Sequence, residues 1–169
     1  MALINLTGIQ PTDYRLLAEG EAPAEGETVA VPLVQLLEAD EAFFASAGNV
    51  GAVIDTETAF DTLGEIADKI AFAVIEFPAF GDGRGFSLAV RLRKDFAFKG
   101  EIRAAGPVIP DQALFLLRAG FDTVDAADER KVAFEAALER YPAFYQTDFG
   151  GQVSVAHARH SAEGQRKAS

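Results

Sequence analysis

Short runs of apolar residues recur along the chain, and stretches whose apolar positions repeat with a helical period lie between them. The run over residues 71–75 is apolar at every position, which is typical of a central parallel strand covered on both faces. Such runs predict strands over residues 28–31, 50–54, 71–75, 101–105 and 121–124. The periodic stretches predict helices over residues 32–47, 60–70, 84–96, 111–119 and 129–140.

This alternation amounts to about five β–α units with right-handed crossovers. It predicts one α/β domain over residues 1–149, with an open, mostly parallel, flavodoxin-like sheet. A partial β/α barrel has the same alternation and is the alternative, because strand order cannot be read from the pattern. Residues 1–27 are predicted to be peripheral, and the polar residues 150–169 are predicted to form a mobile tail.

The junction after the strand over residues 71–75 concentrates the candidate chemistry, because open α/β sheets bind ligands at the carboxyl ends of strands. Glycines alternate there, so backbone amides near Gly83 and Gly85 could approach an anion at the helix start, with Arg84 contacting a carboxylate, sulfite or phosphate. The spacing matches neither a phosphate loop nor a dinucleotide fingerprint. The candidate ligand or partner residues of this junction are Glu76, Asp82, Gly83, Arg84, Gly85 and Ser87.

Glu76 follows a buried strand, so its carboxylate needs a partner or a raised pKa. An ion pair with Arg84 or Arg118 is favoured slightly over general acid–base catalysis, because structural ion pairs also occupy strand ends.

Two later junctions supply the remaining candidates. Asp111 and Gln112 lie at the head of a predicted helix, where capping by Asp111 is favoured over contact with a ligand. Arg118 precedes Gly120, and the pair is explained by a helix end with a left-handed terminator.

Composition narrows the function classes. The formal net charge of −11 argues against nucleic acid as a partner and leaves either a simply solvated acidic surface or a basic protein partner. Cysteine is absent, which excludes a cysteine-ligated iron–sulfur cluster. No apolar run approaches the roughly 20 residues that span a bilayer, so the sequence predicts a cytoplasmic protein that does not enter a membrane.

No recognisable catalytic set is present. His157 and His160 lie in the polar segment near the C-terminus, an unfavourable place for a catalytic base or a metal site, and Ser87 has no histidine base in the predicted core. The residues therefore indicate no particular reaction, cofactor or metal ligand.

Several of these segments together resemble a known family. They include Glu76-Phe77-Pro78, Asp82-Gly83-Arg84-Gly85, Gly100-Glu101-Ile102-Arg103-Ala104, Asp111-Gln112 and Gly120-Phe121-Asp122. Over residues 1–147 the chain resembles the bacterial family catalogued as domain of unknown function 934. Members are described as oxidoreductases or accessory proteins of sulfite reduction, so the resemblance implies that pathway.

Within this pathway the lack of cysteine favours an accessory protein, which docks to sulfite reductase or another sulfur-assimilation enzyme, over the subunit that carries the metal centre. The alternatives are a cofactor-dependent oxidoreductase that uses a strand-end cleft, and a sensor of a small anion.

Overall fold

Seven strands form one sheet in the order β1-β7-β6-β5-β4-β3-β2 in the computed structural model, which describes residues 2–140. Strands β2 to β7 are parallel to one another, and β1 is antiparallel to β7. The strands are β1 Ala2–Asn5, β2 Arg15–Leu16, β3 Thr28–Pro32, β4 Asn49–Asp55, β5 Phe72–Glu76, β6 Glu101–Ala105 and β7 Thr123–Ala126. The helices are α1 Leu33–Glu38, α2 Glu41–Ser46, α3 Phe60–Ile66, α4 Arg84–Lys94, η1 Pro110–Gln112, α5 Ala113–Ala119, η2 Asp128–Arg130 and α6 Lys131–Glu139.

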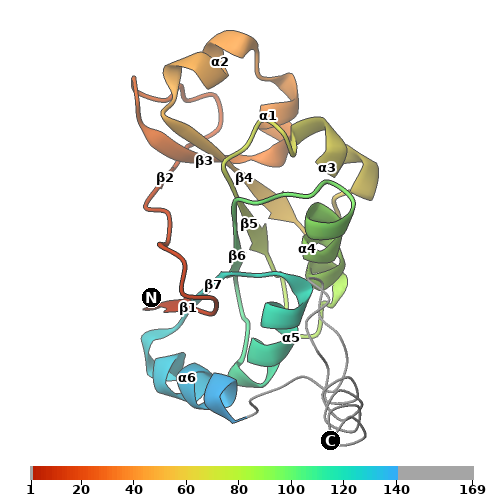
Figure 1. Ribbon diagram of the computed structural model, residues 1–169. Coiled ribbons are helices and arrows are strands. Elements are labelled where there is room, and N and C mark those ends of the chain that lie inside the picture. The colour runs from red at the N-terminus through yellow and green to blue at the C-terminus, as the bar shows by residue number, and fades with distance from the viewer. Residues whose placement is uncertain (1, 141–169) are drawn as a thin grey trace, which may run out of the picture.

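The parallel strands lie side by side in the order in which the chain forms them. Right-handed crossovers between strands in such an order place the connecting helices on one face of the sheet. Figure 1 shows α1, α3, α4 and α5 along that face, while the chain between β1 and β2 passes over the other face. The predicted open, mostly parallel α/β sheet is confirmed, and its curl gives it the form of half a barrel, as in the alternative arrangement.

Burial on both faces explains the continuous apolar strands. In β5, Ala73 and Ile75 belong to the main core beneath the helices. Phe72 and Val74 point the other way and form a second cluster with Ala30. Because successive side chains of a strand alternate between faces, a strand covered on both sides must be apolar at every position.

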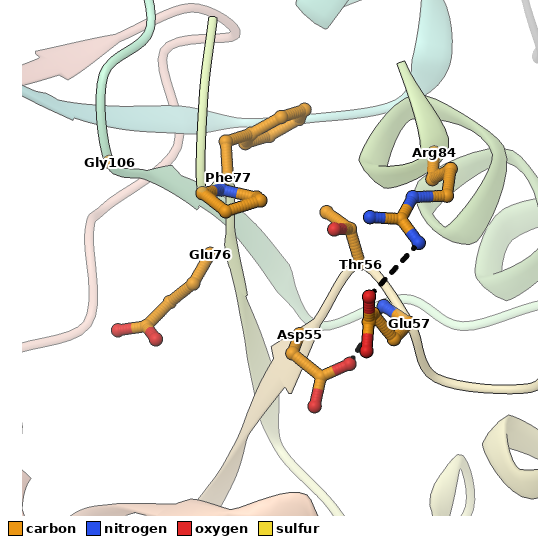
Figure 2. A pocket seen from close by; sticks show the side chains of 8 residues that line it. Asp55, Thr56, Glu57, Glu76, Phe77, Arg84 and Gly106 are labelled. Atoms are coloured by element: carbon orange, nitrogen blue, oxygen red, sulfur yellow. Dashed lines mark hydrogen bonds and ion pairs between the residues drawn. The ribbon is translucent and has the colours of Figure 1, made fainter. Parts of the chain in front are cut away.

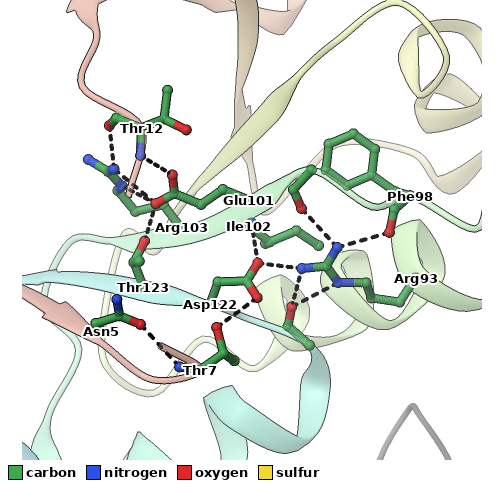
Figure 3. Close-up of polar contacts among 12 residues, drawn as sticks. Asn5, Thr7, Thr12, Arg93, Phe98, Glu101, Ile102, Arg103, Asp122 and Thr123 are labelled. Atoms are coloured by element: carbon green, nitrogen blue, oxygen red, sulfur yellow. Dashed lines mark hydrogen bonds and ion pairs between the residues drawn. The ribbon is translucent and has the colours of Figure 1, made fainter. Parts of the chain in front are cut away.

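The N-terminal segment is held on the face opposite the helices by buried polar groups (Figure 3). Glu101 accepts hydrogen bonds from the Thr12 amide and the Thr123 hydroxyl, and Arg103 donates to the Thr12 carbonyl at 2.7 Å. Burial by itself would raise the pKa of Glu101, but hydrogen bonds from Thr123, Thr12 and Arg103 outweigh it and lower the pKa. Tyr14 stacks on Phe72 beside this network.

Two predictions from the pattern are wrong. The prediction that residues 1–27 are peripheral is wrong, because residues 2–5 and 15–16 form strands β1 and β2 of the sheet and Ile4 and Leu17 are buried in the core. The single helix expected over residues 32–47 is two helices. Asp40 separates them, since its side chain accepts a hydrogen bond from the Phe43 amide and caps α2.

None of the helices within residues 2–140 is long and apolar enough to cross a bilayer.

A buried ion pair ties α4 to the sheet at the edge where the strands begin. Arg93 pairs with Asp122 and donates to the carbonyls of Phe98, Gly100 and Gly120 (Figure 3). Asp122 also accepts the Ile102 amide at 2.8 Å. The side chains of Arg93 and Asp122 are only 8% and 13% exposed, so removal of either partner leaves a desolvated charge.

We therefore expect Asp122→Ala to lower the free energy of unfolding by about 3 kcal/mol, measured by urea denaturation. Asp95→Ala is the matched control, because it removes the exposed Arg91–Asp95 pair of the same helix. That control is expected to cost less than about 1 kcal/mol. Equal losses in the two variants would contradict the structural role of the buried pair.

Candidate functional site

A cleft of about 480 Å³ lies at the carboxyl ends of β4 and β5 (Figure 2). Its lining comes from the end of β4, the end of β5, the head of α4 and the turn after β6. The lining residues are Asp55, Thr56, Glu57, Glu76, Phe77, Pro78, Arg84 and Gly106. The predicted junction is therefore found at the edge of the sheet where parallel α/β proteins collect ligands.

Asp82 organises the head of α4. Its carboxylate accepts hydrogen bonds from the Arg84 amide at 3.0 Å, from the Arg84 guanidinium at 2.7 Å and from the Thr56 hydroxyl at 2.7 Å. The hydrogen bonds from the Arg84 side chain and amide and from Thr56 hold the pKa of Asp82 well below its usual range. The place that an external anion would take at this helix start is thus filled by a carboxylate of the chain itself.

Two glycines allow α4 and the turn after β6 to pack closely against Phe77 at the end of β5. A Cβ at Gly85 would lie 2.6 Å from the Phe77 ring, so the glycine lets α4 pack directly on the end of β5. Gly106 has φ +100°, and a Cβ there would lie 2.2 Å from the Phe77 carbonyl oxygen. Gly85 therefore has a packing role at the position where an open approach for an anion was predicted, whereas Gly83 is exposed at the N-cap of α4.

Gln112 joins two of the loops at this edge. Its Nε2 donates to the Phe80 carbonyl at 2.9 Å, and its Oε1 accepts the Ile109 amide at 3.0 Å. The predicted cap by Asp111 is wrong, because Asp111 is exposed and the side chain that accepts an amide at this helix start is that of Gln112. The amide of Gln112 thus fastens the loop before α5 to the loop before α4.

Glu76 does not pair with Arg84, which corrects the ion pair expected from the sequence. Arg84 binds Asp82 and, at 3.5 Å, Glu57, and Figure 2 shows the Glu76 carboxylate directed away from it. Glu76 is exposed and lies opposite Asp55 in the register of β4 and β5. Two carboxylates on neighbouring strand ends therefore share one side of the sheet.

Sequence reasoning missed Asp55, Thr56 and Glu57, which line the same cleft. They follow the predicted strand over residues 50–54 just as Glu76 follows the next one. The signal was therefore available, because polar residues directly after adjacent parallel strands meet at one edge.

The other sequence candidates lie elsewhere. Ser87 is exposed on a flank of α4, where it lies with Phe60 and Arg91. Arg118 is in the last turn of α5, a helix that runs back from the cleft, so Arg118 lies near the edge where the strands begin. Gly120 ends that helix with φ +104°, as predicted. His157 and His160 lie outside the described residues.

The cleft is acidic. Three lining carboxylates, from Asp55, Glu57 and Glu76, face one lining guanidinium, from Arg84, whose charge is already matched by Asp82. No group of three or more His, Cys, Asp or Glu residues within 2–140 is arranged to hold a metal ion. The arrangement suits contact with positive groups better than with anions.

The comparison with family models finds a match over residues 51–156, more than half of the chain, to the family described as "Bacterial protein of unknown function (DUF934)". The chain belongs to this family. The match includes β5, all of β4 except its first two residues, and the whole of the cleft lining. The comparison with curated proteins finds no match.

The lowered pKa of Asp82 predicts how the stability of the protein depends on pH. The pKa of Asp82 is lower in the folded than in the unfolded protein, where it is about 3.9. Its contribution to stability is therefore complete above about pH 5 and declines as the pH falls below about 4. We expect the wild type to be more stable than Asp82→Asn at pH 7, and urea denaturation should show the difference narrowing toward pH 3.

Asp61→Asn is the control, because Asp61 lies in the first turn of α3 and accepts no hydrogen bond from residues 2–140. We expect this change to alter the free energy of unfolding by less than about 0.5 kcal/mol at pH 7. A wild-type advantage over Asp82→Asn that stays constant down to pH 3 would contradict the ionic bond between Asp82 and Arg84.

Proposed function

We propose that this protein is an accessory protein of assimilatory sulfite reduction that docks to sulfite reductase and does not carry the metal centre. The observation that carries the docking role is the acidic cleft, in which Asp55 and Glu76 place carboxylates at the carboxyl ends of neighbouring strands. The pathway rests on the family resemblance. An acidic surface attracts a partner whose contact surface is rich in Lys and Arg, and it speeds their encounter.

The same charges argue against a small anion such as sulfite as the ligand of this cleft. Arg84 is the lining cation, and Asp82 binds its guanidinium. An anion that approached Arg84 would displace a carboxylate held by three hydrogen-bonding groups and would lie near Glu57. Like charges at such short range disfavour binding.

A cofactor-dependent oxidoreductase is the second candidate, and the size and place of the cleft favour it. A volume of about 480 Å³ lies within the range of about 300–1,000 Å³ that is common for ligand pockets. The phosphates of a flavin or nicotinamide nucleotide would, however, face the carboxylates of Glu57 and Glu76. Native mass spectrometry with added flavin and nicotinamide nucleotides tests this candidate, because a stable one-to-one complex would support it over the docking role.

The proposed pathway predicts the growth of a deletion strain. A bacterium that lacks the protein should fail to grow on sulfate or sulfite as the sole sulfur source and should grow on sulfide, because sulfide enters after the reduction step. Complementation with the wild-type chain should restore growth on sulfate and on sulfite. Growth of the deletion strain on sulfite at the wild-type rate would contradict the proposal, as would failure on sulfide.

A further inference from the structure

The β5–α4 loop carries an exposed apolar run beside the acidic cleft. Pro78, Ala79 and Phe80 are consecutive exposed residues, and Phe80 keeps 60% of its surface accessible. Pro78 also lines the cleft together with Asp55 and Glu76. An aromatic residue next to a rim of charges is the usual composition of a protein–protein contact surface.

The exposure of Phe80 is not the result of a loosely held loop. The Phe80 carbonyl accepts a hydrogen bond from Gln112, and the Asp82 amide donates to the Ala79 carbonyl at 3.0 Å. The Asp82 side chain is bound by Thr56 and Arg84. A loop fixed in this way loses little conformational entropy when a partner binds, which favours affinity.

We propose that sulfite reductase docks on this surface, with Phe80 as the central contact and the carboxylates of Asp55, Glu57 and Glu76 as the rim. We call these four residues the Phe80 surface. The reductase should present an apolar depression bordered by Lys and Arg. This inference rests on the proposed function and adds to it the place of contact and the chemistry of the partner's surface.

Charge favours such a partner over a second copy of the chain. A symmetric pairing through the Phe80 surface would bring the carboxylates of Asp55, Glu57 and Glu76 against their own copies, in a chain whose formal net charge is −11. Like charges placed opposite each other in an interface oppose association.

Binding of the full chain to purified sulfite reductase of the same bacterium tests the inference. We expect Phe80→Ala to weaken binding about 30-fold, mainly through faster dissociation. Its melting temperature should be unchanged, because the ring is exposed. Leu16→Ala is the control: Leu16 is 59% exposed on β2, three strands away from β5, and this change should alter the dissociation constant less than about twofold.

The triple variant Asp55→Asn, Glu57→Gln, Glu76→Gln tests the rim. Its association with the reductase should be about tenfold slower at low salt and much less sensitive to ionic strength than that of the wild type.

The outcomes distinguish a wrong docking surface from a wrong docking function. If the wild type binds the reductase and both variants bind equally well, the Phe80 surface is wrong and the docking function stands. If the wild type does not bind, the docking function and the surface fall together. A dimer in analytical ultracentrifugation that Phe80→Ala dissociates would assign the surface to a second copy and overturn the inference.

Discussion

The carboxylate of Asp82 is the group on which the arrangement of the cleft depends. It satisfies the first amide of α4, binds the Arg84 guanidinium and accepts the Thr56 hydroxyl from the neighbouring strand end. One side chain thereby fixes the helix start, the loop before it and the link to β4. Because Arg84 is turned toward Asp82 and Glu57, Glu76 remains exposed without an ion-pair partner among the described residues.

The sequential order of the parallel strands brings the loops that follow them together at one edge of the sheet. Each parallel strand ends beside the end of the next, so residues far apart in the chain, such as Asp55 and Glu76, become direct neighbours. Gln112 adds the loop after β6 through the Phe80 carbonyl. Three successive β–α loops therefore meet at one edge, which supports a docking role for an acidic surface with a fixed aromatic residue.

The sequence predicted the five inner strands because burial on both faces leaves a continuous apolar run, as in β5, whereas the short edge strand β2 was missed. It did not predict the strand order, since every order of β–α units has the same pattern. The ion pair predicted between Glu76 and Arg84 was wrong for a local reason. Asp82 lies two residues before Arg84, and its carboxylate accepts a hydrogen bond from the Arg84 guanidinium within the same turn. The split at Asp40 was missed because a capping side chain interrupts the helix without disturbing its apolar period.

In the proposed complex, sulfite reductase contacts the edge formed by the strand ends. Hydrogen–deuterium exchange of the full chain, with and without sulfite reductase, tests it most directly. We expect slower exchange over residues 55–58 and 77–84 in the complex, and unchanged exchange around Arg93 and Gly120 at the opposite edge. Protection at that opposite edge with none over residues 77–84 would contradict docking at the strand ends.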